Sequence, residues 1–451
     1  MSLTYDQPAP SSKSGASPAM RSFEAQWRRR EQDGLAALRA EAMERFLGLG
    51  LPTPRDESWR YTNLRRIAGT QYIDAPVQER SYIEPTASVS LIDASQRAAI
   101  VTMVNGLPWL DSMDAILNDI EISSLSDLIK LDPKNALRLM QPNSSAEPDR
   151  FDLLNTALFT DGLYLKVTQT VTTPLVILHV GMGDEGDTAT TSFPRVIIEV
   201  APGASATIIE HHVAQGERTP LVNSHTHIAL GRGAQLEHYR VFATGANATH
   251  IDSLDIHGQQ DSYCLQFTIA LGGGLVRANL RANLAERGAS IGCQALLVGH
   301  ATRHVDCFNE VIHAAPDTVS RQTARAIGSD TSRVVFNSKV VVKAGAVRSD
   351  SQQSCRGLLL SPTAEIDTRP QLEIHTDEVK CAHGATVGRL DPDMLFYLLS
   401  RGIDRDTAQS LLVFAFLSDV LTGMSVASAR VAIENALINQ LPDSQLLRNF
   451  R

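Results

Sequence analysis

The sequence predicts a mainly β protein, a solenoid of stacked strands with helical regions before and after it. β-type runs rich in Val, Ile and Thr recur through the middle of the chain, where convincing helical stripes disappear. Small Gly-Ala turns separate many of these runs, and capped helical patterns fill both ends. A β-sandwich shows a similar alternation, so periodicity alone leaves that architecture open. The predicted regions are a disordered tail (1–20), an N-terminal helical and mixed region (21–160), the solenoid core (161–390) and a C-terminal helical domain (391–451).

The composition is that of an ordinary globular protein. Of the 451 residues, 43% are hydrophobic and 20% are charged, and a formal net charge of −9 argues against nucleic-acid binding, because nothing would neutralise phosphates. No apolar run approaches the length that crosses a bilayer, so no membrane association is expected; the longest compact run is Leu411–Leu417. Five cysteines without a CxxC pair, and no apolar leader, predict a reducing compartment, by default the cytoplasm.

The N-terminal region begins with a predicted helix over Phe23–Leu49, which prolines and glycines then end. The segment Glu57–Leu64 follows, and its Trp59 is expected to anchor this helix to the body by aromatic packing rather than to take part in catalysis. Apolar spacing predicts two further helices, around Leu125–Ile129 and Ala136–Met140.

The central region repeats a strand, a small turn and another strand. Its β-type runs are Leu175–Val180, Val196–Val200, Ala206–Val213, His225–Leu230, Leu236–Phe242 and Val334–Val342. Its small turns are Gly203-Ala204, Gly233-Ala234, Gly288-Ala289, Gly345-Ala346 and Gly384-Ala385. Such a unit suits a solenoid, in which each coil stacks on the next and small residues fit the tight corners.

Helical patterns return at Asp391, which fits an N-cap, and Gly402 fits the residue just past the helix. Asp404 and Ser425 are expected to start two further helices. We expect the three helices to cover the open end of the solenoid and to offer an apolar face to a partner. The apolar face of the first helix is formed by Leu395, Leu398 and Leu399.

Cys381 and His383 are the strongest candidates for chemistry. They lie two residues apart, so in an extended segment both side chains point to the same face. Thiolate and imidazole are both ligands for iron, and cysteine is the usual ligand of iron–sulfur clusters. The structural alternative, a small core cysteine beside a satisfied turn histidine, stays open, because buried cysteines are common.

The other histidines include two close pairs. His211 and His212 are adjacent and must face opposite sides of a strand, so they cannot easily chelate one ion. His225 and His227 share a face, but no third ligand is fixed by spacing, and we expect them to be surface residues of a strand.

Three further cysteines carry weaker expectations. Cys293 and Cys307 are isolated and are predicted to be packing residues. Cys355 stands next to Arg356, whose charge would lower the pKa of the thiol.

Several motifs of enzymes are absent from the sequence. It contains no GxxxxGK[ST] phosphate loop and no HExxH motif, and Gly272–Gly274 lacks the strand-to-helix setting of a dinucleotide site. The chain is therefore predicted to be non-catalytic and not to hydrolyse ATP by a phosphate-loop mechanism.

The segment His383–Gly388, followed by Leu395–Ile403, resembles the C-terminal signature of the SufB/SufD family. These proteins are scaffold subunits of the SUF iron–sulfur cluster assembly machinery. Glu57–Leu64 resembles the E-x-W-K/R-Y-T element near the N-terminus of the family, and Phe151–Gly162 resembles the approach to its central body. Gly384 favours the SufD branch, because SufB-like chains more often carry an acidic residue directly after the histidine.

The resemblance implies a right-handed parallel β-helix and a SufD-like scaffold role with two partners, a SufB-like subunit and a SufC-like ABC ATPase. It also implies a transient iron–sulfur cluster shared with the partner chain, leaves room for a flavin in the complex, and allows a homodimer when the chain is alone. His383 is then the metal-binding position at the interface of the two scaffold subunits, with Cys381 beside it. The residues expected to bind the ATPase are Leu395, Phe396, Tyr397, Arg401 and Phe414.

The alternative functions are a β-helix carbohydrate-active enzyme and a hexapeptide-repeat acyltransferase. A β-helix carbohydrate-active enzyme would need clustered carboxylates on one face of the solenoid, and no such cluster is visible in the sequence. A hexapeptide-repeat acyltransferase would need many consecutive hexads, and Gly384–Gly388 supplies only one.

Overall fold

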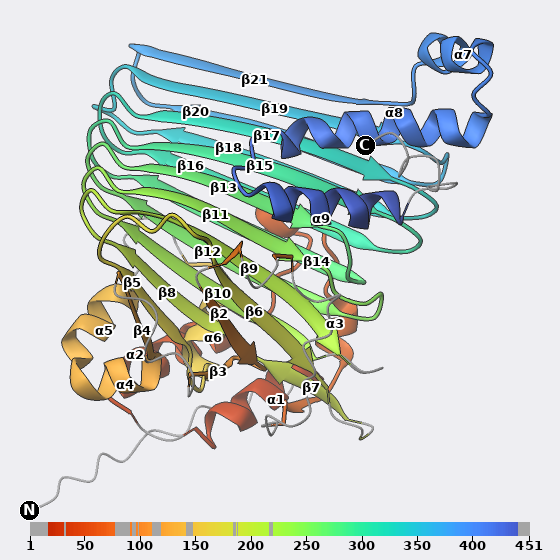
Figure 1. The fold of residues 1–451 in the computed structure, drawn as a ribbon. Helices are drawn as coiled ribbons and strands as arrows, with labels where there is room; N and C mark the ends of the chain where they lie inside the picture. The colour runs from red at the N-terminus through yellow and green to blue at the C-terminus, as the bar shows by residue number, and fades with distance from the viewer. Residues whose placement is uncertain are drawn as a thin grey trace, which may run out of the picture.

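The computed structural model describes residues 17–30, 33–76, 91–92, 96–97, 99–110, 119–140, 148–183, 186, 188–215 and 220–440. The body is a β-solenoid of about seven turns with helices toward both ends of the chain, as Figure 1 shows, so the predicted fold class is confirmed. Residues 1–16, which make up most of the predicted disordered tail, lie outside the described residues.

Two sheets form the walls of the solenoid, and from β8 to β21 successive strands of the chain alternate between them. Sheet 1 contains, in spatial order, β20 (Glu365–Ile374), β18 (Arg333–Val342), β16 (His304–His313), β14 (Leu275–Leu284), β12 (Thr249–Gly258), β10 (Leu221–Leu230), β8 (Arg195–Val200), β5 (Leu163–Val167) and β4 (Ile120–Ser124), with β7 (Ala189–Ser192) and β1 (Tyr72–Asp74) at its side. Sheet 2 contains β21 (Val379–Gly388), β19 (Ser349–Leu359), β17 (Val319–Gly328), β15 (Ser290–Gly299), β13 (Tyr263–Ala270), β11 (Gln235–Phe242), β9 (Ser205–Gln215), β6 (Leu175–Met182), β2 (Ala99–Val104) and β3 (Leu107–Trp109).

Parallel pairing between coils distinguishes this solenoid from the β-sandwich that periodicity left open. Only β2–β3 and β4–β5 pair antiparallel among the described strands. The parallel register stacks equivalent inward positions, so that one side chain rests on the next along the axis. One buried row of this kind is Ile228, Ile256, Ala282, Val311 and Val340.

Four of the five predicted Gly-Ala turns are turns with a left-handed glycine: Gly203, Gly233, Gly288 and Gly345 have φ of 74°, 67°, 76° and 86°. The fifth prediction is wrong. Gly384 and Ala385 lie in the middle of β21, where the backbone stays extended and continues its ladder with β19.

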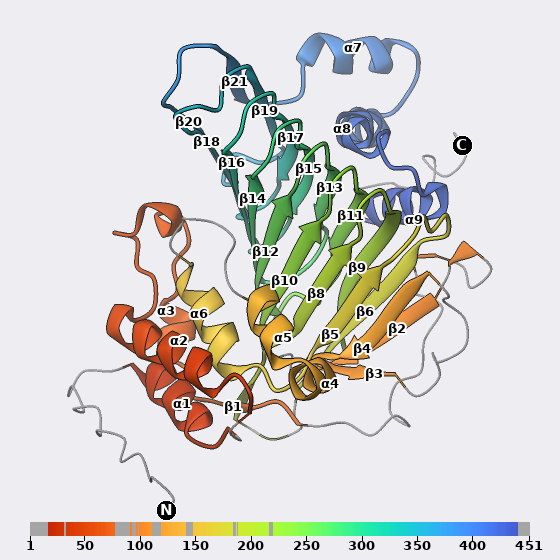
Figure 2. The ribbon, with the colours of Figure 1, turned by 90° about the vertical axis from the view of Figure 1, so that its left-hand side faces the viewer.

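The N-terminal helices lie against the outer face of sheet 1 (Figure 2). They are α1 (Pro18–Trp27), α2 (Ala36–Leu49), the 3-10 turn η1 (Glu57–Trp59), α3 (Arg65–Gly69), α4 (Leu125–Leu131), α5 (Pro133–Met140) and α6 (Arg150–Leu158). The single helix predicted over Phe23–Leu49 is therefore two helices, and the first begins at Pro18, inside the predicted tail.

The break between α1 and α2 has a local cause. The Asp33 carboxylate accepts the backbone N–H of Leu35 at 2.9 Å and pairs with Arg39 at 2.8 Å, which competes with helical bonding. Gly34 packs against α4, and a Cβ there would lie 3.3 Å from Ile129 Cγ2. A glycine in close contact with another helix thus interrupts the predicted helix.

Trp59 fixes this helical region to the solenoid, as the aromatic segment predicted. Its side chain is buried, and its indole Nε1 donates to Asp149 Oδ2 at 2.8 Å. The ring lies 5.3 Å from that of Phe151 on α6 and 4.5 Å from the guanidinium of Arg277 on β14. Arg277 in turn pairs with the buried Asp306 on β16. One indole therefore joins the turn before α3, helix α6 and sheet 1.

The C-terminal helices are α7 (Pro392–Ser400), α8 (Arg405–Leu421) and α9 (Ala427–Ile438), and no described helix is long and apolar enough to span a membrane. The prediction that all three cover the open end of the solenoid is wrong. Helices α8 and α9 lie along the outer face of sheet 2, which is apolar through residues such as Tyr239 and Phe267 (Figures 1 and 2). Helix α9 begins at Ala427 rather than at Ser425, because the Ser425 hydroxyl bonds the Glu237 carboxylate.

We predict that Trp59→Ala lowers the free energy of unfolding by about 3–5 kcal/mol, because it leaves a cavity between α6 and sheet 1. Trp59→Phe should lower it by about 1–3 kcal/mol, because the ring stays but Asp149 loses a buried donor. Urea unfolding followed by circular dichroism measures both changes.

Leu131→Ala is the control for the Trp59 variants. Leu131 is 85% exposed on α4, so its truncation should change the free energy of unfolding by less than about 0.5 kcal/mol. An effect of Trp59→Ala as small as that of Leu131→Ala would contradict the anchoring role.

Candidate functional site

The candidate site lies at the open end of the solenoid, on the last strand of sheet 2. Strand β21 pairs with β19 through a ten-residue register, and its other edge has no strand partner in the described part of the chain (Figure 1). Cys381 stands opposite Ser351, and His383 stands opposite Gln353. Both predicted site residues are therefore on one extended strand at the end of the stack.

Cys381 and His383 differ in exposure. Cys381 is half-buried and packs against the interior core, and burial raises the pKa of its thiol. His383 is exposed, and no hydrogen bond joins its side chain to another described residue. The alternative of a satisfied turn histidine is thus wrong, because the residue is neither on a turn nor hydrogen-bonded.

The other four cysteines are buried inside the solenoid. Burial raises the pKa of Cys293, Cys307 and Cys355 to about 12 and raises that of Cys264 still further above its usual value. Cys293 and Cys307 are packing residues, as predicted. The prediction of a lowered pKa at Cys355 is wrong, because Arg356 points to the opposite, exposed side of β19 and burial dominates.

Helix α7 carries most of the residues predicted to bind the ATPase, and none of its side chains is buried. Phe396 is 71% exposed and Tyr397 is 57% exposed, with the Arg401 guanidinium 5.1 Å from the Tyr397 ring. Leu395 is half-buried toward α8, and Phe414 on α8 is also half-buried. Figure 2 shows α7 projecting away from the sheets beyond α8.

A cavity of about 650 Å³ lies beneath these helices. Leu395 of α7, Val413 and Leu417 of α8 and Leu437 of α9 line it, together with the turns that follow β15, β17 and β19. Helix α7 thus turns Leu395 toward the cavity and leaves Phe396 and Tyr397 exposed.

The predicted exposure of His225 and His227 is wrong, because both side chains are buried, on the same face of β10 as Asn223, whose amide donates to Phe151 O of α6. His225 Nε2 lies 2.8 Å from Asp255 Oδ2, and Arg281 pairs with the same carboxylate. Burial lowers the pKa of His227 to about 4. These two histidines are structural members of the contact with the N-terminal region.

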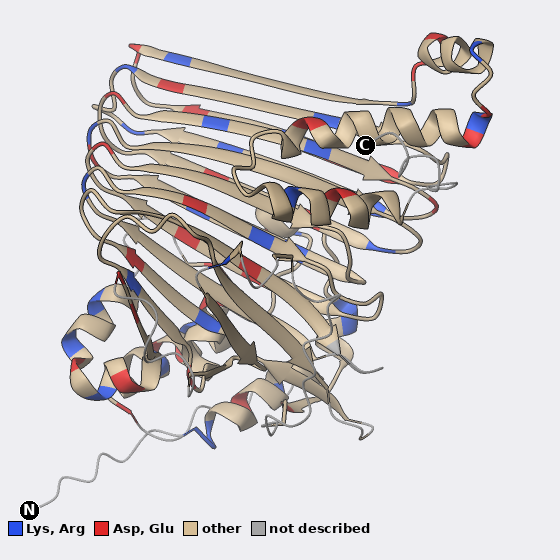
Figure 3. Cartoon of the chain, in the orientation of Figure 1, with Lys and Arg blue, Asp and Glu red and all other residues tan. Residues whose placement is uncertain are grey.

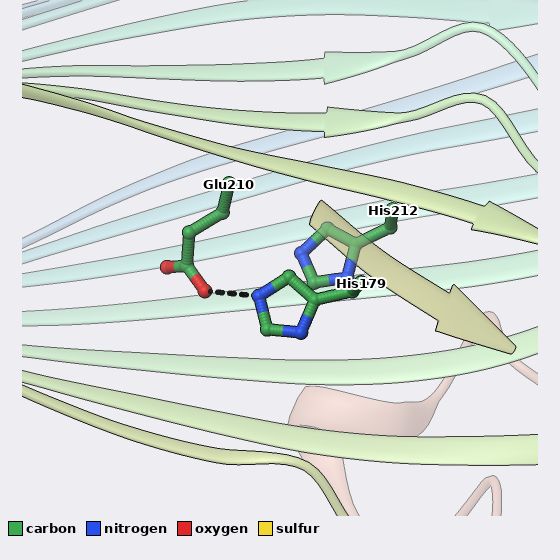
Figure 4. Close-up of side chains that lie close together, drawn as sticks. All are labelled: His179, Glu210 and His212. Carbon is green, nitrogen blue, oxygen red and sulfur yellow. Dashed lines mark hydrogen bonds and ion pairs between the residues drawn. The ribbon is translucent and has the colours of Figure 1, made fainter. Parts of the chain in front are cut away.

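His211 and His212 face opposite sides of β9, as adjacent strand residues must. His212 points into the solenoid, where its ring stacks on that of His179 at 4.3 Å (Figure 4). Glu210 and His250 lie beside these two rings. This group of polar side chains was not predicted from the sequence. The only signal was a polar residue at an inward position on each of three strands, and its meaning depends on a register that the sequence does not show.

Charges are mixed over the surface rather than gathered into one field. Figure 3 shows Lys and Arg interspersed with Asp and Glu along the strands and helices of this view.

Comparison with known proteins bears on both halves of the chain. Residues 181–416 match the family model described as SUF system FeS cluster assembly, SufBD core domain, and residues 20–177 match the SufBD protein N-terminal region. The iron–sulfur cluster assembly protein SufD of Escherichia coli is 28% identical over 84% of this chain and 86% of its own length. A SufBD family protein of Synechocystis is 27% identical over 88% of this chain and 89% of its own, and SufD of Bacillus subtilis is 23% identical over 88% and 91%. A SufBD core spread over the solenoid, together with the matching N-terminal region, shows that the chain belongs to the SufBD family of iron–sulfur cluster assembly proteins.

Proposed function

We propose that the chain is a SufD-like, non-catalytic scaffold subunit whose cluster-assembly site is completed by a partner chain. The observation that supports this most is His383, an exposed imidazole without a hydrogen-bond partner in the described chain, on a strand whose outer edge is unpaired. Relatives along most of the chain bear the name iron–sulfur cluster assembly protein.

The unpaired edge of β21 suits a SufB-like subunit. An edge strand presents a row of free N–H and C=O groups, and strand addition from another chain is a recurring way to cover it. A partner that covered this edge would bring its own side chains next to Cys381 and His383. A second copy of this chain could occupy the same edge when the partner is absent.

The cluster in this proposal is cargo, held transiently and shared between chains. A cluster normally takes about four ligands, usually thiolates. At the open end this chain offers one half-buried thiol, Cys381, and one exposed imidazole, His383. The remaining thiols are locked in the core with raised pKa values, so the partner would have to supply the other ligands. A flavin in the complex remains a prediction of the family resemblance.

ATP turnover is assigned to a SufC-like ABC ATPase, since the sequence has no phosphate loop. The exposed aromatic pair Phe396 and Tyr397 on α7, with Arg401 over the tyrosine ring, would be the center of its docking surface. Aromatic residues and arginine are the residue types most enriched at energetic centers of interfaces.

We predict that the isolated chain does not hold a stable cluster after anaerobic reconstitution with iron and sulfide. The reason is that Cys381 is the one cysteine of this chain that is not buried in the core, whereas a cluster usually takes about four ligands, mostly thiolates. Labile sulfide assays and visible absorption measure the outcome, with the complete complex as the positive control. Stoichiometric sulfide on the isolated chain would contradict the need for a partner.

His383→Ala should leave folding and complex formation intact while cluster content in the complex falls by about tenfold or more, as expected when a metal-site residue is lost. The thermal midpoint should not change, because the imidazole has no described partner to lose. Iron and sulfide content of the purified complex, measured beside its yield, checks this.

His375→Ala is the matched control for His383→Ala, because His375 is also exposed and follows β20 in the same last coil. It should retain normal cluster content. Cys381→Ser shows whether the thiol acts with the imidazole, in which case both changes are severe. Normal cluster content in a folded His383→Ala complex would remove this residue from the mechanism.

Phe396→Asp on α7 should weaken association with the SufC-like ATPase by about 30-fold, the loss of roughly 2 kcal/mol typical of an interface hot spot. A point change is preferable to removing residues after 390, because α8 and α9 bury Leu417 and Ile433 against sheet 2. Calorimetric titration measures the affinity, with Leu131→Asp on the distant α4 as control. Unchanged affinity for the Phe396 variant would exclude this surface.

A further inference from the structure

A second group of ligand-type side chains lies inside the solenoid, away from the open end. Its five members are almost fully buried, with relative exposures between 1% and 5%. They come from β6, β9 and β12 and point into the interior, and Figure 4 shows three of them. The members are His179, Glu210, His212, His250 and Asp252.

The parallel register brings these residues together. His179 on β6 is the register partner of His212 on β9, and their rings stack at 4.3 Å. Phe242 on β11 continues the stack at 4.8 Å. His250, from the facing sheet, meets the edge of the His212 ring with 4.7 Å between ring centroids.

Hydrogen bonds fix which imidazole nitrogens carry protons. Glu210 Oε2 accepts at 2.9 Å from His179 Nε2, so in the neutral imidazole His179 Nδ1 is the nitrogen with the lone pair. The Ser224 hydroxyl donates to Asp252 Oδ1 at 2.5 Å, so His250 Nε2 must donate to Ser224 at 2.8 Å, which leaves a lone pair on His250 Nδ1.

None of these lone pairs has a proton donor in the described chain. His179 Nδ1, His250 Nδ1 and both nitrogens of His212 are buried and form no hydrogen bond with a described residue. A buried acceptor without a donor is destabilising, and native proteins keep few of them. The interior therefore presents a surplus of electron pairs, which a cation would satisfy.

The charges point the same way. Burial lowers the pKa of His212 well below its usual value and that of His250 to about 3, which favours the neutral form of both rings. Burial acts to raise the pKa of Glu210, but hydrogen bonds from His179 and His238 outweigh it and hold this pKa well below the usual range. Arg240 pairs with Asp252, and no described lysine or arginine pairs with Glu210. The cluster thus holds one carboxylate more than it holds permanent cations.

A small cavity of about 20 Å³ is lined by all three imidazoles. That volume suits one water molecule or one ion. Two triads offer ligand atoms within 4.8 Å of one another, His179–Glu210–His212 and His212–His250–Asp252, and they share His212. Ligand bonds to zinc or iron are about 2.0–2.2 Å long. To bind one ion at these distances, His212 has to turn from its stacked orientation and the other side chains have to shift slightly.

We propose that this interior cluster binds one divalent first-row transition-metal ion, such as Fe²⁺ or Zn²⁺, with His212 as the ligand common to both triads. Imidazole and carboxylate together favour these ions over Mg²⁺ and Ca²⁺, which prefer oxygen ligands alone. The carboxylate of Glu210 behind His179 is the usual outer partner of a metal-bound histidine. The site is separate from Cys381 and His383 and does not rest on the proposed scaffold function.

Titration of the untagged, metal-stripped full chain with Co²⁺ tests the proposal, because Co²⁺ reports its ligands by visible absorption. We expect one Co²⁺ per chain, displaced by Zn²⁺, and a higher thermal midpoint for the loaded protein. His212→Phe removes both nitrogens but keeps a ring between His179 and Phe242, so the metal-free variant should fold normally. Its Co²⁺ affinity should fall by roughly 100-fold or more.

His300→Phe is the control, because His300 is half-exposed on a turn and pairs with Asp330; it should bind Co²⁺ as the wild type does. If His212→Phe does not fold, Glu210→Gln is the variant that tests the site. It removes the carboxylate charge but keeps an acceptor for His179, and it should weaken Co²⁺ binding by about tenfold. Absence of stoichiometric Co²⁺ from the wild type, as expected if the cavity holds only water, would overturn the proposal. Wild-type affinity in His212→Phe or in Glu210→Gln would overturn it equally.

Discussion

The in-register parallel stacking of coils is the constraint on which the rest of this structure depends. Each inward side chain contacts the equivalent side chain of the coil before and the coil after. The size and polarity of one inward residue therefore restrict which residue types fit at the same position of the next coil. Where the row is aliphatic, as from Ile228 to Val340, it forms a continuous core. Where a polar residue enters, its hydrogen bonds must come from neighbouring coils or from the facing sheet, because water is excluded.

One such row of inward positions runs from His383 to the interior histidine cluster. In sheet 2 the inward position of His383 is followed, coil by coil, by Gln353, Gln322, Cys293, Gln266 and His238. His238 donates to Glu210 at 2.9 Å, so this mostly polar row ends at the interior histidine cluster. The exposed imidazole therefore lies on the same inward face of sheet 2 as His179, Glu210 and His212, and the other two cluster members come from sheet 1. A polar row through a solenoid core is unusual for stability alone, since aliphatic residues would pack there without needing partners.

The sequence was informative about everything that depends on local pattern. The β-type runs located β6, β8, β9, β10, β11 and β18, and Asp391 with Gly402 bounded α7 as capping rules require. It was misleading where one signal has two meanings: a Gly-Ala pair marks a corner at Gly345 but lies in an extended strand at Gly384. It could not reveal the interior cluster, because His179, Glu210, His212 and His250 are far apart along the chain and meet only through the register. That register depends on coil lengths, and the uneven spacing of the turns in the sequence does not fix them.

The position of a residue in the solenoid also decides how many neighbouring strands of the same chain surround it. A residue on the last coil, such as His383, has a neighbour on one side only, so half of its surroundings must come from another molecule. A residue in a middle coil, such as His212, has neighbours on both sides and from the facing sheet, so its chemistry is complete within one chain. In the two proposals, the same fold separates an interface site, which acts together with a partner chain, from an interior site that the isolated chain can form. Dependence on a partner follows from where each histidine stands in the stack rather than from the chemistry of the imidazole.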